Sequence, residues 1–191
     1  VVLYAGGGRN ARPADPQRIK KRCGPGRPLN IHVTDVKTDP TMRILIQRVR
    51  EASVDIGGER HSAIGAGMLV LTGIEEADTD TDVEWLCGKL LKLRIFDDEA
   101  GVMNRSAEET GADILIVSQF TLHALTRKGN RPSYIRAARP EKAVPLYESF
   151  VAAVRQGATG RVETGVFGAD MQVALVNDGP VTIWIDSQNR E

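Results

Sequence analysis

Short apolar runs and stretches of alternating apolar and polar residues recur from residue 43 onward, and they predict β-strands. Ile114-Leu115-Ile116-Val117 and Val173-Ala174-Leu175-Val176 are continuous apolar runs, typical of strands buried on both faces. Ala52 to Ile56 alternates before Gly57-Gly58, a pair that favours a hairpin turn. The predicted strands are residues 43–49, 52–56, 67–73, 94–96, 113–119, 161–167, 171–177 and 181–186.

Two further segments place apolar residues at helical spacing. The first begins near Asp78, Asp80 and Asp82, whose charges suit a helix start, and continues to about Arg94. The second runs from Lys142 to Gln156. Strands, then two strand–helix units, then more strands predict one α/β or α+β layered domain with helices on one face of the sheet.

Residues 1–41 differ in composition from the rest of the chain. They contain Gly6-Gly7-Gly8, five prolines and the basic cluster Arg18-Ile19-Lys20-Lys21-Arg22, with few large apolar side chains. Such a segment buries too little surface to offset its ordering entropy, so we expect disorder here and a folded domain over residues 42–191, beginning at Met42. The segment is interpreted either as a basic arm that helps hold RNA, or as a solvated tail or extension without a role, which we favour.

A net charge of zero hides an asymmetry between these two parts. Residues 1–41 carry 8 Lys/Arg against 3 Asp/Glu, and residues 42–191 carry 17 against 22. An acidic domain is unusual for a protein that grips a long nucleic-acid backbone, although it suits a partner of which only one end is engaged.

The sequence also favours a cytoplasmic protein. It has no run of ~18 apolar residues that would predict a transmembrane helix, and its apolar start is too short for a signal sequence. Cys23 and Cys87 are isolated, which argues against a disulfide scaffold and a structural zinc site.

Two polar motifs follow the two apolar runs: Ser118-Gln119-Phe120-Thr121-Leu122 and Asn177-Asp178-Gly179-Pro180-Val181-Thr182. Donors at the end of a buried strand can form an oxyanion hole for acyl transfer, where one fixed donor contributes ~3–4 kcal/mol in the transition state. On chemistry alone we favour a simpler interpretation, in which Ser118 and Thr121 satisfy local backbone groups and Gly179-Pro180 is a turn between two strands.

Other catalytic patterns are absent from the sequence: it has no GxSxG elbow, P-loop, HExxH or dinucleotide fingerprint. Its three histidines are scattered, and only His123 lies near a motif. A single histidine there favours a surface or pocket-lining side chain over a general base. No carboxylate cluster indicates a metal.

Four motifs in order resemble the D-aminoacyl-tRNA deacylase family. They are the Ser118 motif, the segment from Lys128 to Tyr134 (KGNRPSY), the segment from Gly165 to Met171 (GVFGADM) and the Asn177 motif. The opening residues 43–49 with Ala52-Ser53-Val54 match as well. The resemblance covers Met42 to about Asp186, and four ordered motifs are far more specific than any one alone.

This resemblance implies an enzyme that hydrolyses the ester linking a D-amino acid to the terminal adenosine of tRNA, and also the ester of glycine mischarged on tRNA(Ala). It implies mixed and antiparallel sheets rolled into a barrel-like core with two helices on one face. It further implies a homodimer with active sites at the interface, without metal or cofactor and without contact to a membrane.

The family's site residues carry over by position. Ser118, Gln119, Phe120 and Thr121 would form the catalytic wall. Gly179 and Pro180 would join through a cis peptide and reach into the partner's pocket, and Tyr134 and Met171 would bind substrate. This chain departs from the family at His123, where small residues are common, and at Tyr134, where phenylalanine is usual. His123 would alter only the pocket rim.

Rigid main-chain carbonyls would let such a site distinguish D- from L-aminoacyl groups. Two carbonyls at Gly179-Pro180 would receive the ammonium of the aminoacyl group and leave room for a side chain on one side of the α-carbon only. A thousandfold preference needs ~4 kcal/mol, which lost hydrogen bonds and a clash supply. Glycine has no side chain and would not be excluded.

Two roles compete for Thr121. Its hydroxyl would attack the ester, although no neighbouring base is evident to activate it. Alternatively, the backbone N–H groups of Phe120 and Thr121 polarise the carbonyl, while water positioned with help from the 2′-hydroxyl of the RNA attacks. We favour the second.

Two other functions stay open at this point. One is a related deacylase that removes small L-amino acids from mischarged tRNA, for which a trans bond at Gly179-Pro180 would open the pocket. The other is a non-enzymatic RNA-binding module that uses Arg18 to Arg22.

Overall fold

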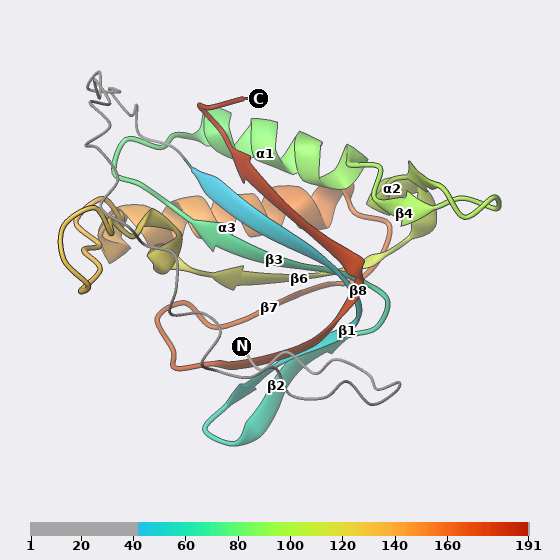
Figure 1. Cartoon of the computed structure of the whole chain (residues 1–191), viewed down its shortest axis with the longest axis horizontal. Coiled ribbons are helices and arrows are strands. Elements are labelled where there is room, and N and C mark those ends of the chain that lie inside the picture. The colour runs from blue at the N-terminus through green and yellow to red at the C-terminus, as the bar shows by residue number, and fades with distance from the viewer. Residues whose placement is uncertain (1–41, 191) are drawn as a thin grey trace, which may run out of the picture. The chain divides into compact units, whose positions relative to one another are not determined.

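A computed structural model of the protein describes residues 42–190; the segment 1–41, for which we expected disorder, lies outside the described residues. Strand β1 (Arg43–Ile56) runs through a six-stranded sheet in the order β2-β1-β3-β6-β7, with β8 also paired to β1 (Figure 1). The sequence predicted two strands, at 43–49 and 52–56, where the structure has one continuous strand.

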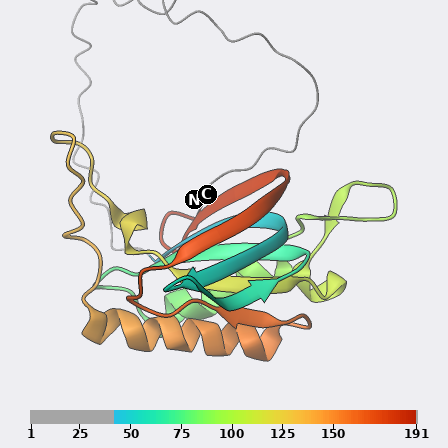
Figure 2. The same ribbon diagram turned by 90° about the horizontal axis from the view of Figure 1, so that it is seen from below.

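The length of β1 gives it three partners. Its first half pairs antiparallel with β3 (Gly67–Gly73) and its second half with β2 (Glu59–Ile64). Its other edge pairs antiparallel with β8 (Gln172–Asp186) along almost the whole strand. Because strands twist with a fixed hand, a strand that serves three partners rolls the sheet into a nearly closed, barrel-like form (Figure 2).

The strands that lead to the pocket are parallel. β3 pairs with β6 (Asp113–Ser118), and β6 pairs with β7 (Val162–Thr164). All seven residues of β3 are buried. At its start, Gly67 leaves room for the neighbouring strand, since a Cβ there would lie 1.9 Å from the carbonyl oxygen of Asp113.

Two long helices pack against one face of the sheet, as the sequence predicted. α1 (Asp80–Lys92) and α3 (Pro140–Gly157) lie on the same face and contact each other (Figure 1). They bury apolar side chains such as Leu86 and Phe150 in one cluster with Ile116 of β6. A second apolar cluster, with Leu69, Leu115 and Val117, fills the opposite side of the sheet. The expected mixed α/β domain with a barrel-like core is confirmed.

Several smaller elements differ from the prediction. β4 (Phe96–Asp97) and β5 (Met103–Arg105) pair where a strand ending at Phe96 and a loop were expected. The short helix α2 (Ala107–Thr110) was missed, although its start carries a readable signal: Ser106 and Glu109 form a reciprocal capping box.

The predicted and observed strands differ most in the C-terminal part of the chain. β7 spans three residues instead of the predicted 161–167, and residues 172–186 form one strand where two were predicted. Gly179-Pro180 is therefore not a turn between strands. Gln47 pairs with Thr182 and Val49 with Asn177, so residues 178–181 bulge out of β8 opposite Arg48 alone.

Among the described helices, none is long and apolar enough to cross a membrane. Cys87 is a buried free cysteine of α1, and Cys23 lies outside the described residues.

Candidate active site

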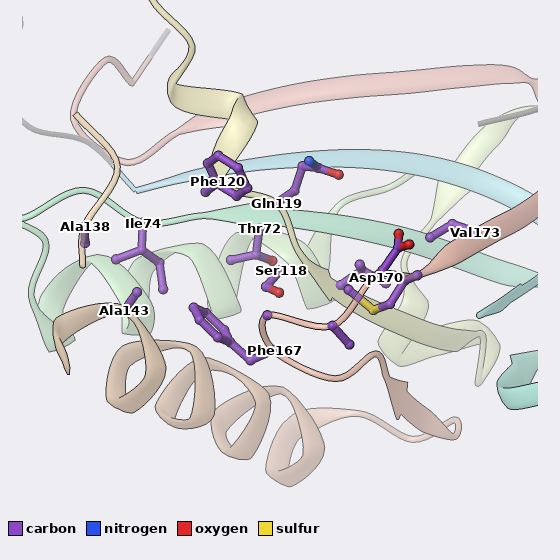
Figure 3. Close-up of a pocket in the computed structure, with 14 residues that line it drawn as sticks. Thr72, Ile74, Ser118, Gln119, Phe120, Ala138, Ala143, Phe167, Asp170 and Val173 are labelled. Atoms are coloured by element: carbon purple, nitrogen blue, oxygen red, sulfur yellow. The ribbon is translucent and has the colours of Figure 1, made fainter. Parts of the chain in front are cut away.

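A pocket of about 310 Å³ opens at the carboxyl end of β6 (Figure 3). Such ends of parallel strands are common ligand sites, because the strands stop there and leave polar backbone groups at the rim. The lining comes from the ends of β3 and β6, the start of α3 and the loop between β7 and β8. Of the predicted site residues, Ser118, Gln119, Phe120 and Met171 line it.

The chain leaves β6 through a short 3₁₀ helix, η2 (Phe120–His123), at the edge of this pocket. The backbone N–H of Gln119 donates to the carbonyl oxygen of Thr72 at 2.7 Å, which fixes the start of η2 against β3. The N–H groups of Phe120 and Thr121 donate to no acceptor within residues 42–190, because the first amides of a helix have no partner in their own helix. Two adjacent backbone donors are thus available beside the pocket.

Thr121 does not line the pocket, and its hydroxyl is engaged locally. The side-chain amide of Gln119 donates to Oγ1 of Thr121. In the part of the chain that the structure describes, no carboxylate or imidazole forms a hydrogen bond with that hydroxyl. The geometry therefore offers Thr121 no base.

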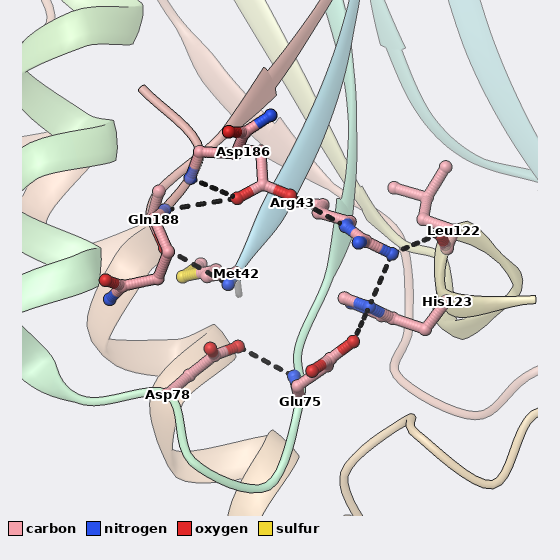
Figure 4. A network of polar contacts seen from close by, with 10 residues as sticks. Met42, Arg43, Glu75, Asp78, Leu122, His123, Asp186 and Gln188 are labelled. Atoms are coloured by element: carbon pink, nitrogen blue, oxygen red, sulfur yellow. Dashed lines mark hydrogen bonds and ion pairs between the residues drawn. The ribbon is translucent and has the colours of Figure 1, made fainter. Parts of the chain in front are cut away.

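His123 is buried, so the expectation of a surface or pocket-lining side chain was wrong (Figure 4). Its Nδ1 lies 2.9 Å from Oε1 of Glu75 and 3.3 Å from Nη1 of Arg43. Burial lowers the pKa of His123, and the backbone of Gly73 and the carboxylate of Glu75 oppose that shift. Facing this network instead of the pocket, His123 changes neither the rim nor the chemistry.

Asp78 belongs to the same buried network (Figure 4). Its Oδ2 accepts the backbone N–H of Glu75 at 2.7 Å, and its Oδ1 has no hydrogen-bond partner in the described structure. Burial and, to a smaller extent, the nearby carboxylates of Asp82, Glu75 and Asp186 raise the pKa of Asp78 to about 7, against the hydrogen bond from the Glu75 amide, which lowers it. The helix start predicted near Asp78, Asp80 and Asp82 is confirmed: Thr79 is the N-cap of α1, and Asp80 and Asp82 lie in its first turn.

An aromatic pair stands at the outer side of the pocket. The rings of Phe120 and Tyr134 meet edge to face, with centroids 5.0 Å apart. Phe120 lines the pocket and Tyr134 does not, so Tyr134 reaches the pocket only through Phe120. The half-exposed ring of Phe120 and the neighbouring Tyr134 give the site an apolar outer rim.

Gly179 and Pro180 are exposed and do not line the pocket of their own chain. The peptide bond that joins them is cis, as the resemblance implied. The buried guanidinium of Arg48 holds the base of the bulge: its Nε lies 3.2 Å from Oδ2 of Asp178, and its Nη1 donates to the carbonyl oxygen of Ile95 at 2.7 Å.

Most of the lining residues were not predicted as site residues, Thr72 and Phe167 among them. Thr72, at the end of β3, is buried, and its Oγ1 has no hydrogen-bond partner among the described residues. Phe167, from the loop after β7, forms part of the pocket wall and contacts the ring of Tyr147 (Figure 3). Only the position of Phe167 within the GVFGADM motif could have indicated a role. Within residues 42–190, His, Cys, Asp and Glu nowhere gather in threes that could hold a metal ion.

Comparison with known proteins places this geometry in a family. A family model described as D-Tyr-tRNA(Tyr) deacylase matches residues 45–186. The D-aminoacyl-tRNA deacylases of Cytophaga hutchinsonii and Akkermansia muciniphila are 60% and 61% identical over 150 residues, which are 78% of this chain and all of each relative.

Two solved structures share the fold. One is named c-Myc DNA Unwinding Element Binding Protein; it is 43% identical, with a TM-score of 0.72 over 75% of this chain and 97% of its own. The other, described as a probable eukaryotic D-amino acid tRNA deacylase, has a TM-score of 0.68 over 76% and 99% of the two chains. At 22% identity it supports the fold alone.

The fold, with its pocket at the end of β6, and these matches define a hydrolase of the aminoacyl-tRNA deacylase class. Within that class, the chain belongs to the D-Tyr-tRNA(Tyr) deacylase family.

Proposed function

We propose that this protein hydrolyses the ester bond of D-aminoacyl-tRNA and releases the free D-amino acid and tRNA. The observation that carries the proposal is the pair of unengaged N–H groups, of Phe120 and Thr121, beside a pocket in a chain of this family. Such donors stabilise the oxyanion that forms when the ester carbonyl is attacked. Proofreading of aminoacyl-tRNA takes place where translation does, in the cytoplasm.

The attacking group in this proposal is water. The hydroxyl of Thr121 accepts from Gln119 and has no base beside it, and His123 is buried away from the pocket. A hydroxyl without a base is a weak nucleophile at neutral pH. The 2′-hydroxyl of the terminal adenosine helps position the water, and Ser118 and Gln119 complete the polar wall.

In this proposal a second copy of the chain completes the site. Gly179 and Pro180 project from β8 as an exposed bulge, held at its base by Arg48. In a homodimer the bulge enters the partner's pocket, and its carbonyls bind the substrate ammonium and reject L-side chains. Met171, which lines the pocket, and Tyr134, which supports Phe120, contact the substrate.

The decisive experiment measures ester loss from D-Tyr-tRNA, L-Tyr-tRNA and Gly-tRNA(Ala) in parallel. We expect rapid deacylation of the D-tyrosyl ester and of the glycyl ester, and at least about a thousandfold slower deacylation of the L-tyrosyl ester, which corresponds to ~4 kcal/mol. Equal rates for the two tyrosyl esters would refute stereoselection. L-Ala-tRNA, included as a fourth substrate, tests the alternative of a deacylase for small L-amino acids.

One observation favours a second candidate, which is non-enzymatic nucleic-acid binding. A 43% identical solved structure bears the name of a DNA-unwinding-element binding protein. Under this alternative the chain binds nucleic acid but leaves all four esters intact. The same assay, with binding followed in parallel, therefore separates the two functions.

A further inference from the structure

A loop of distinct composition connects η2 to α3. Residues 124–139, called the basic loop below, contain Arg127, Lys128, Arg131, Arg136 and Arg139 and no acidic residue. The other residues of 42–191 carry 12 Lys/Arg against 22 Asp/Glu. The basic loop is therefore a concentrated positive surface on an otherwise acidic domain.

The cations of the basic loop differ from those of the sheet in their ion pairing. On the sheet, Arg43, Arg48, Arg50, Arg60 and Arg161 each pair with an aspartate.

In the basic loop, by contrast, the exposed side chains of Arg127, Lys128, Arg131 and Arg139 form no ion pair or hydrogen bond with any residue of the described range 42–190. Four unpaired cations on one loop are available for an external anion.

The loop is also held in place at the mouth of the pocket. Reciprocal backbone hydrogen bonds of 2.8 and 3.0 Å join Leu125 and Ser133 and close its base. At its far end, the N–H of Ala138 donates to the carbonyl oxygen of Ile74 at 2.8 Å, and both residues line the pocket. Figure 2 shows the segment, coloured yellow to gold, extending beyond the end of the sheet.

We propose that the basic loop is the docking surface for the sugar–phosphate backbone of the substrate tRNA next to its aminoacylated 3′ end, with Arg127, Lys128 and Arg131 as the phosphate ligands. An ester bound in the pocket places the phosphates of the preceding nucleotides outside the pocket mouth, where the loop extends. The ring of Phe120, which lines the pocket, meets the ring of Tyr134, which belongs to the basic loop, and this partly exposed pair offers an apolar surface to a base.

The proposal explains how an acidic domain binds RNA. The protein contacts only the acceptor end of the tRNA, so positive charge is needed only on the basic loop. The acidic remainder of the domain repels the rest of the tRNA. Each phosphate contact contributes a salt-dependence slope of about −0.7 to −0.9 in log affinity against log salt. Three contacts therefore account for a slope of about −2 to −3.

The inference rests on the proposed function, and the test keeps the two apart. The loop variant combines Arg127→Gln, Lys128→Gln and Arg131→Gln in the full chain. The matched control combines Lys89→Gln, Lys92→Gln and Arg155→Gln, three exposed cations of α1 and α3 that do not line this pocket. Both variants lose three positive charges, so a general change of net charge affects them equally.

Three quantities are measured for each protein: the Kd of uncharged tRNA between 50 and 300 mM salt, the kinetics of D-Tyr-tRNA hydrolysis, and the hydrolysis rate of 3′-O-(D-tyrosyl)adenosine, which has the ester but no phosphate. For the loop variant we expect a Kd and KM raised roughly tenfold or more at 150 mM salt, and a salt slope reduced by about 2 to 3. Its kcat and its rate on the adenosine ester stay at the parental values. The control keeps the parental slope.

Two outcomes would overturn the assignment. If the loop variant binds tRNA with the Kd and slope of the control, the loop is not the docking surface, whatever the fate of the proposed function. If the loop variant loses activity on tRNA and on the adenosine ester alike, the loop supports the pocket instead of binding phosphate. Failure of the parent protein to cleave either ester refutes the proposed function, and the tRNA Kd values then decide on the loop alone.

Discussion

The proposed mechanism assigns separate roles to the Thr121 side chain and to the backbone of η2. Thr121 supplies a hydroxyl that accepts from Gln119, and the segment supplies two unengaged N–H groups. In Thr121→Val the hydroxyl is lost and the shape is kept. We expect deacylation within about tenfold of the parent, because removing one neutral hydrogen bond costs about 1 kcal/mol. Single-turnover rates on D-Tyr-tRNA check this, and near-total loss of activity would rule out the backbone mechanism.

Replacement of Phe120 tests the backbone donor directly. Phe120→Pro removes its N–H at the first position of a helix, where proline is well accommodated, and Phe120→Ala is the control for loss of the ring. We expect kcat of the proline variant to fall about 10²- to 10³-fold below that of the alanine variant, as for loss of one oxyanion donor. Equal kcat values in the two variants would contradict the oxyanion hole.

Asp78 makes stability depend on pH. Its pKa is about 7 in the folded protein against 3.8 ordinarily, so the folded state holds its proton more tightly than the unfolded state. The free energy of unfolding therefore falls as pH rises from about 4 to 7, by up to about 4 kcal/mol.

Asp78→Asn keeps the acceptor for the Glu75 amide and cannot ionise, so its Tm should match the parent at pH 4.5 and exceed it at pH 8. Thermal melts from pH 4.5 to 8 measure this. Glu84→Gln removes an exposed carboxylate of α1 and should retain the parental pH dependence. An Asp78→Asn protein that loses stability equally at both pH values would show that the carboxylate is needed in its charged form.

At the scale of elements, the stability of the sheet depends on the close approach of β3 and β6. A Cβ on Gly67 would lie 1.9 Å from the backbone oxygen of Asp113, so β3 and β6 must separate in Gly67→Ala. We expect a loss of about 2–4 kcal/mol, similar to other disruptions of packed cores.

Gly88 offers the matched control within α1. Nothing lies within 4 Å of a Cβ placed there, and alanine in a helix interior is favoured over glycine by about 1 kcal/mol. Gly88→Ala should therefore raise the midpoint of urea unfolding while Gly67→Ala lowers it. Similar midpoints for the two variants would show that the strands tolerate separation.

The spacing of apolar residues along the sequence predicted the long helices and the buried strands, because that spacing depends on which side chains are buried. It placed a break at Gly179-Pro180 because these residues ordinarily end strands, yet pairing with β1 continues on both sides of the bulge. His123 was misjudged for a related reason: its burial depends on Glu75 and Arg43, which lie 48 and 80 residues away. Ser118, Gln119, Phe120 and Met171 were found at the pocket through motif resemblance, whereas Thr72 became visible only through its unpartnered hydroxyl.

At the scale of the whole molecule, the proposed sharing of the site between two copies of the chain predicts complementation between inactive variants. Phe120→Pro damages the pocket, and Gly179→Val damages the bulge, since a Cβ there would lie 2.8 Å from Cγ2 of Val181. Co-unfolded and refolded together at equal amounts, they should give about a quarter of the parental activity, because about half of the dimers are mixed and each holds one intact site. If the bulge serves its own chain, mixing restores nothing.

The expected domain boundary at Met42 gives a second prediction at this scale. The family model matches residues 45–186, and the relatives match 150 residues of this chain over their entire length. Deletion of residues 1–41 should leave kcat and the Kd of tRNA within about twofold of the full chain. A loss of tRNA affinity without loss of kcat would assign the segment a role as a basic arm.

The pairing of β1 with β8 determines when the domain can finish folding during its synthesis. Arg43 and Asp186 are joined by an ion pair across 143 positions of sequence, and the two strands are paired along nearly their whole length. A nascent domain therefore leaves the ribosome with one edge of its first strand bare until the last strand has been translated. Such long-range pairing slows folding, and until β8 is made the unpaired edge of β1 can pair with other chains. Premature stop codons before residue 172 should therefore yield chains that aggregate instead of shorter active enzymes.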